Sequence, residues 1–155
     1  MKCVLLRVGK GRCAWADTAT KDFTRRFQRT LPWEEIRLKP EPERGDIDRV
    51  KVAEGERVLA RVQRGDLLVV LDERGESLTT DDFEALFAGA LRDGRSRVVF
   101  AIGGPHGHGE AVRQQAARVI ALSPMVLNHE LARVILVEQI YRVSTMMWGG
   151  GYHHV

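Results

Sequence analysis

The sequence has little cysteine and no long hydrophobic run. Among its 155 residues only Cys3 and Cys13 are cysteines, and they form no CxxC pair. The sequence therefore gives no sign of a disulfide framework or of a paired-cysteine metal site. No stretch approaches the roughly 20 apolar residues of a membrane span, and the first residues lack the pattern of a secretory signal. We therefore expect one cytoplasmic domain with reduced thiols and no membrane partner.

Basic residues are concentrated in the first half of the chain. Residues 1–65 carry 16 Lys and Arg against 10 Asp and Glu, whereas residues 66–155 carry 8 against 11. The residues Lys21, Arg25 and Arg29 are spaced four apart, so they share a face of the helix expected there. Such a face suits a polyanion such as RNA, although a solvated charged surface has the same pattern. We take Arg25 and Arg29 as candidate RNA-binding residues.

Hydrophobic periodicity predicts alternating strands and helices. Alternation of this kind predicts a single α/β domain, with a mainly parallel sheet and helices on both faces. The run Asp66–Asp72 is the strongest strand signal, followed by a turn at residues 73–75. Asp46 is a plausible N-cap. Strands are expected at residues 2–8, 33–38, 66–72, 97–102 and 119–122, and helices at about 15–29, 46–62, 79–92, 110–118 and 130–147.

The stretch IGGPHGHG, residues 102–109, follows a predicted strand and has too many glycines to continue it. Three ligands are conceivable: a phosphate, a metal held by His106 and His108, or a flat heterocycle such as adenine. The stretch lacks the lysine and hydroxyl of a P-loop and fails GxGxxG, and no HExxH or carboxylate cluster accompanies the histidines. These observations favour the heterocycle, with no metal and with both histidines exposed in the loop.

Three strand ends carry turn-forming residues: 71–73, 102–105 and 122–125. In a parallel sheet, ligands bind beyond the carboxyl ends of the strands, so these segments predict a composite pocket if their strands are neighbours. The last helix adds apolar surface beyond one face, which indicates either a subunit interface or a helix central to the monomer. Glu138 and Arg142 are spaced as an i,i+4 ion pair on that helix.

Four segments together resemble the ribosomal RNA large subunit methyltransferase H family, which is a SPOUT-class family. They are LVVLDERG (68–75), FAIGGPHGHG (100–109), ALSPMVLNHELARVILVEQIYR (121–142) and YHH (152–154). The resemblance covers the whole chain and implies S-adenosyl-L-methionine as cofactor, a C-terminal trefoil knot and a homodimer formed through the last helix. The cofactor contacts that it implies are Leu71, Gly103, Gly104, Ser123, Pro124, Met125, Val126, Leu127 and Asn128.

The resemblance also implies the reaction, which is methyl transfer to N3 of a pseudouridine in the intersubunit hairpin of 23S rRNA, within the assembled 70S ribosome. His153 is then the proton acceptor, and Tyr152 and Arg142 orient the target base. His129, Arg133 and His154 join Arg25 and Arg29 as expected RNA contacts. An alternative is a ribosome-binding or assembly factor that keeps the cofactor pocket but catalyses weakly.

Two departures from the family pattern affect these expectations. The family usually has a proline before the tyrosine and a basic residue after YH, whereas this chain ends in GGGYHHV. The altered tail motivates the binding-factor alternative. Asn128 and Glu130, on either side of His129, also differ from the usual residues.

Overall fold

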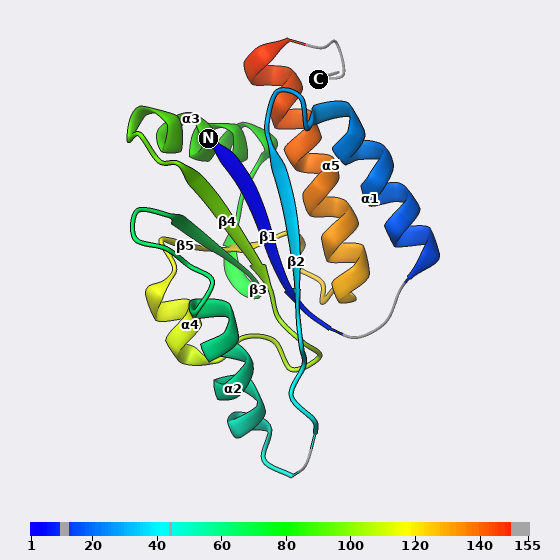
Figure 1. The fold of residues 1–155 in the computed structure, drawn as a ribbon, viewed down its shortest axis with the longest axis vertical. Coiled ribbons are helices and arrows are strands. Elements are labelled where there is room, and N and C mark those ends of the chain that lie inside the picture. Colours follow the sequence, from blue (N-terminus) through cyan, green and yellow to red (C-terminus); the bar gives the residue numbers. More distant parts are fainter. Residues whose placement is uncertain (10–12, 44, 150–155) are drawn as a thin grey trace.

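The computed structural model describes residues 1–9, 13–43 and 45–149, and its centre is one sheet of five parallel strands (Figure 1). The strand order is β2-β1-β4-β3-β5, so strands remote in sequence become neighbours. The predicted α/β class and the parallel sheet are confirmed. The strands are β1 (Lys2–Val8), β2 (Trp33–Leu38), β3 (Leu67–Ser77), β4 (Arg97–Ile102) and β5 (Arg118–Ala121).

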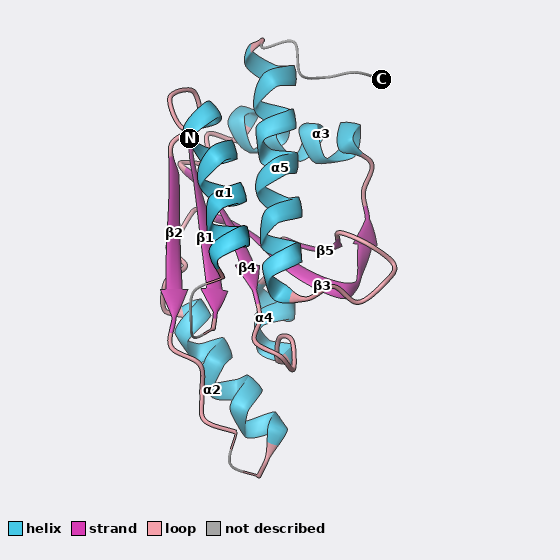
Figure 2. Ribbon diagram, turned by 90° about the vertical axis from the view of Figure 1, so that its right-hand side faces the viewer, coloured by secondary structure: helices cyan, strands magenta, loops and turns pink. Residues whose placement is uncertain are grey.

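Helices cover both faces of the sheet (Figure 2). On one face pack α1 (Ala14–Phe27), α3 (Thr80–Arg92) and α5 (His129–Trp148); on the other pack α2 (Ile47–Leu59) and α4 (Glu110–Gln115). Successive side chains of a strand point to opposite faces, so each strand contributes to both cores. No helix of the described part is long and apolar enough to cross a membrane.

Side-chain caps begin three of the helices. The carboxylate of Asp46 accepts hydrogen bonds from two backbone amides of α2, as predicted. Thr79 and Asp82 form a reciprocal capping box at the start of α3, and Asn128 Oδ1 accepts from the amide of Glu130 at 2.8 Å. These caps satisfy amides that have no partner within the helix, and they fix where each helix begins.

Strand β3 is longer than predicted. It continues through residues 73–75 to Ser77, and a bulge lets both Leu71 and Glu76 pair with Ile120 of β5. Gly75 permits this because a Cβ there would lie 2.6 Å from the carbonyl carbon of Ile120. The close backbone approach keeps in the sheet a segment whose composition favours a turn.

Helix α4 is shorter than predicted, and β5 begins one residue earlier. The helix ends at Gln115, Ala116 is extended, and the amide of Ala117 donates to the carbonyl of Leu68 at 2.9 Å. The chain thus joins the sheet where the sequence pattern still favours helix. The trefoil knot and the single-domain organisation stay predictions.

The last helix lies within the monomer along much of its length. α5 packs against α1 and α3, and Val137 and Ile140 are fully buried, whereas Leu131 is exposed. Burial in the monomer therefore explains part of the extra apolar surface on this helix. The homodimer through α5 stays a prediction.

Candidate functional site

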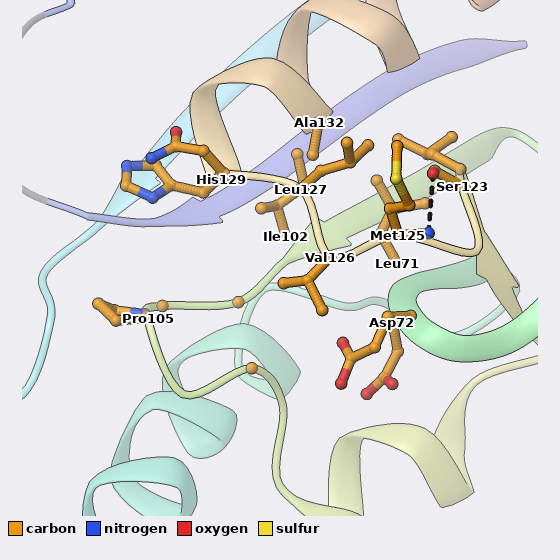
Figure 3. Close-up of a pocket in the computed structure, with 16 residues that line it drawn as sticks. Leu71, Asp72, Ile102, Pro105, Ser123, Met125, Val126, Leu127, His129 and Ala132 are labelled. Carbon is orange, nitrogen blue, oxygen red and sulfur yellow. Dashed lines mark hydrogen bonds between the residues drawn. The ribbon is translucent and has the colours of Figure 1, made fainter.

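A pocket of about 450 Å³ lies at the carboxyl ends of β4 and β5 and beside the bulge that follows Leu71 in β3, next to the start of α5 (Figure 3). These three strands are consecutive in the sheet, so the composite pocket predicted from their ends is confirmed in position. The lining residues are Leu71, Asp72, Glu73, Ile102, Gly103, Gly104, Pro105, Gly107, Leu122, Ser123, Met125, Val126, Leu127, Asn128, His129 and Ala132.

The pocket has an apolar middle and one polar side chain at each of two ends. Figure 3 shows Ile102, Leu127 and Ala132 together, with His129 and Pro105 at one end and Ser123 and Met125 at the other. Ile102 belongs to the predicted pocket segment 102–105, although it was not among the implied cofactor contacts. Ala132 also lines the pocket, and the sequence analysis did not include it.

The glycine loop forms one wall through a tight turn. The amide of Gly107 donates to the carbonyl of Gly104 at 2.9 Å, and Gly107 has φ +71°. A Cβ on Gly103 would lie 2.8 Å from the carbonyl carbon of Gly107, and one on Gly104 would lie 2.7 Å from Glu54 Oε2. The glycines therefore let the loop fold onto itself and onto α2. This brings main-chain atoms to the pocket wall.

The segment before α5 forms the opposite wall. Ser123 Oγ accepts a hydrogen bond from the amide of Met125 at 3.0 Å, which shapes the turn. The side chains of Met125 and Val126 are 72% and 81% exposed at the pocket rim. Pro124 is exposed and is absent from the lining, although the resemblance implied a cofactor contact there.

Asp72 is a buried carboxylate in the predicted pocket segment 71–73, although the sequence analysis gave it no role of its own. It accepts bonds from the backbone amide, Nε and Nη2 of Arg74 at 2.8–3.0 Å, and from Arg113 Nη1 at 3.3 Å. Burial alone raises the pKa of this carboxyl, but the bonds from Arg74 and Arg113 outweigh burial and lower the pKa to about 2. Asp72 is therefore negatively charged at neutral pH.

The expectation that both loop histidines are exposed is wrong for His108. Its ring is buried, and Nε2 lies 3.2 Å from the carbonyl oxygen of Ala101. Desolvation lowers the pKa of His108, so the ring is neutral at pH 7. His106 is partly exposed, with Nε2 3.2 Å from Glu43 Oε1. Within the described ranges, no group of three or more His, Cys, Asp and Glu side chains is arranged to hold a metal.

Arg133 departs from its expected role as an RNA contact. Its guanidinium is buried and donates to Asp17 at 2.6 Å, to Glu35 at 3.0 Å and to Glu130 at 3.2 Å. Arg7 donates to the same Glu35 and Glu130. Arg133 therefore ties the start of α5 to β2 and α1. Because these carboxylates surround its charge, Arg133 offers no surface contact.

The remaining expected residues are distributed over the molecule. His129 lines the pocket, whereas Arg25 and Arg29 are exposed, with Arg25 paired to Asp22. Arg142 donates to Glu138 at 2.7 Å, which confirms the i,i+4 pair. It lies 13 residues beyond His129, so it is roughly 20 Å further along α5 at the helical rise of ~1.5 Å per residue. Tyr152, His153 and His154 lie outside the described residues.

Comparisons with known proteins give one consistent result. A family model described as "Predicted SPOUT methyltransferase" matches residues 1–153. "Ribosomal RNA large subunit methyltransferase H" of Trichlorobacter lovleyi is 39% identical over 155 residues, which cover 99% of this chain and 100% of that protein. The protein of that name from Thermus thermophilus is 39% identical over 153 residues, covering 99% and 98%. The one from Bacteroides thetaiotaomicron is 38% identical over 157 residues, covering 99% of both.

Proposed function

Because the chain belongs to the SPOUT methyltransferase family, we propose that it methylates large-subunit ribosomal RNA with S-adenosyl-L-methionine as the methyl donor. The observation that carries the proposal is the pocket between three adjacent strands. Its lining includes eight of the nine residues that the sequence resemblance implies as cofactor contacts. An enzyme that acts on ribosomes works in the cytoplasm, so the proposal keeps the expected location.

The residues of the pocket fit this cofactor in size and chemistry. A volume of about 450 Å³ suits a ligand of the size of a nucleoside derivative. Main-chain groups of the turn at Gly104 and of residues 123–128 are suited to bind an adenine edge, with Leu71, Ile102 and Leu127 against its faces. The exposed Met125 and Val126 would be buried by a bound ligand, which favours binding through the hydrophobic effect.

The bound cofactor supplies an electrophilic methyl group on a positively charged sulfur. The task left to the chain is to align the nucleophile with that methyl group and to exclude water. Asp72 keeps a negative charge at the pocket, and its bonds to Arg74 and Arg113 hold it in place. Because two arginines neutralise this buried carboxylate, its role is to hold the pocket wall in place rather than to attract the positive charge of the cofactor.

The proposed catalytic residues are Arg142, Tyr152 and His153, with His153 accepting the N3 proton of a pseudouridine in 23S rRNA. Arg142 lies roughly 20 Å along α5 from the pocket of its own chain, at ~1.5 Å per residue. We therefore propose a homodimer in which the C-terminal end of one chain completes the pocket of its partner. The proposed RNA contacts are His129 at the pocket, Arg25 and Arg29 outside it, and His154.

Methyl transfer to ribosomes tests the proposal. The protein is incubated with methyl-labelled S-adenosyl-L-methionine and 70S ribosomes that lack the modification. Ribosomes that also lack the pseudouridine, and free 50S subunits, serve as controls. The expected result is label in 23S rRNA that requires both the pseudouridine and the assembled particle.

Two outcomes would contradict parts of this proposal. Label in 23S rRNA without the pseudouridine would overturn the proposed target base. Cofactor binding without any label would overturn catalysis and favour the alternative of a ribosome-binding factor that keeps the pocket.

A further inference from the structure

Besides the basic face of α1, a second basic surface lies at the amino ends of the strands, on the side of the sheet opposite to the pocket. Two loops lead into β3 and β4, and residues 60–66 and 91–97 comprise these loops together with the last residues of α3 and the first residue of β4. Both segments lie at the amino ends of these strands. Together they contain five arginines against two aspartates. We call this surface the arginine edge and define it by Arg61, Arg64, Arg92, Arg95 and Arg97.

Hydrogen bonds hold the two loops of the arginine edge together. Arg95 Nη1 donates to the carbonyl of Gly65 at 3.3 Å, and Arg97 Nη2 donates to the carbonyl of Arg61 at 3.0 Å. Arg97 also pairs with Asp66 at 2.5 Å. Two of the five arginines therefore contribute to the architecture of the surface, and Asp66 compensates one of the charges.

The other three arginines have no comparable structural role. Arg61, Arg64 and Arg92 are exposed. Across the described ranges, no carboxylate lies within ion-pair distance of any of the three side chains. Because no ion pair in the described part of the chain neutralises them, these three exposed charges remain available to an anion outside the chain.

We propose that the arginine edge binds the phosphate backbone of ribosomal RNA away from the base that is methylated, an inference that rests on the proposed function. Guanidinium groups match phosphate oxygens through paired hydrogen bonds, and a row of them displaces counterions from a polyanion. Three exposed arginines on two loops suit successive phosphates of a polymer better than one small anion.

The position of the arginine edge gives the contact a defined purpose. It is separated from the pocket by the length of β4, which is six residues or roughly 20 Å at ~3.3 Å per residue. A contact at this distance does not touch the reacting base and recognises no sequence. It adds affinity and orients the enzyme on a large RNA particle.

The experiment measures binding to 70S ribosomes as a function of salt, with the triple variant Arg61→Gln, Arg64→Gln and Arg92→Gln. The dissociation constant is expected to rise at least tenfold at low salt. The slope of log K against log salt should fall by about 2, since each lost phosphate contact removes about 0.7–0.9. Arg49→Gln, which removes an exposed arginine of α2, is the matched control and should leave the slope unchanged.

Protein-free 23S rRNA separates RNA from a ribosomal protein as the partner. A loss of affinity for both ribosomes and naked rRNA supports the proposal, whereas a loss for ribosomes alone overturns it in favour of a protein contact. An unchanged slope, or an equal effect of Arg49→Gln, also overturns it. If the wild-type chain binds ribosomes but transfers no methyl group, the proposed function fails. The comparison of binding by the wild-type chain and the triple variant still tests the arginine edge in that case.

Discussion

Arg7 and Glu130 form a buried ion pair with a distance of 3.0 Å between Nη1 and Oε1, although 123 residues separate them. Arg7 is the penultimate residue of β1, an interior strand of the sheet, and Glu130 lies in the first turn of α5. Residues 123–128 of the pocket end where α5 begins. The pair therefore couples the carboxyl end of β1 to the proposed cofactor wall.

We predict that Glu130→Ala destabilises the protein by about 3 kcal/mol, because it leaves the charges of Arg7 and Arg133 buried with fewer partners. Urea denaturation followed by circular dichroism measures the change. Glu110→Ala is the control, because that glutamate is exposed in the first turn of α4 and its loss should change the stability far less. Equal costs for the two variants would show that the buried pair is unimportant.

We predict that Gly75→Ala destabilises the protein by about 1–3 kcal/mol, because the added Cβ must displace the backbone of Ile120. Gly89→Ala is the matched control in α3, where the new Cβ would lie in ordinary contact with Arg92 Nη2 at 3.7 Å. That change should stabilise the protein by about 0.5–1 kcal/mol. Thermal unfolding of both variants gives the comparison, and a neutral Gly75→Ala would show that β5 can move away freely.

We predict that Asp72 stabilises the folded chain at neutral pH and that this contribution is lost in acid. The pKa of this carboxyl is lower in the folded chain than in the unfolded chain, so its contribution is complete above about pH 4 and disappears as the pH falls toward 2. In Asp72→Asn the stability should therefore fall less steeply over this range. Urea midpoints between pH 2 and 6 test this, and parallel curves for the two proteins would contradict it.

The periodicity of the sequence was sufficient to predict most of the fold. The buried runs at residues 2–8 and 97–102 became strands with those bounds, and the Asp46 cap was confirmed. In these two strands the sequence pattern and the structure agree, because a continuous apolar run is buried on both faces of the sheet. At Gly75 they disagree, because the sheet continues through a segment that favours a turn once β5 packs closely against it.

The location of the pocket was also predictable, whereas the ion pairs around it were not. Turn residues at strand ends indicated which segments converge, but the strand order that makes those ends adjacent is a property of the whole chain. Arg133 shows the limit most clearly. A basic residue near a binding motif suggests a surface contact, and nothing local shows that Asp17 and Glu35 enclose it.

We predict that Ala132→Leu lowers the affinity for S-adenosyl-L-methionine at least roughly tenfold, which corresponds to about 1.4 kcal/mol. Ala132 lines the pocket from the first turn of α5, so a larger side chain there occupies space that the proposed cofactor needs. Ala85→Leu, at an exposed position of α3, makes the same change outside this pocket and should leave the affinity unchanged. Isothermal titration calorimetry measures both.

The most direct test of the pocket and its proposed function is methyl transfer to unmodified 70S ribosomes by the wild-type chain and Ala132→Leu. Both are supplied with the same subsaturating amount of labelled S-adenosyl-L-methionine. The account predicts label in 23S rRNA with the wild-type chain and a loss of at least about tenfold with Ala132→Leu. Equal label from the two proteins, or no label from the wild-type chain despite bound cofactor, would contradict it.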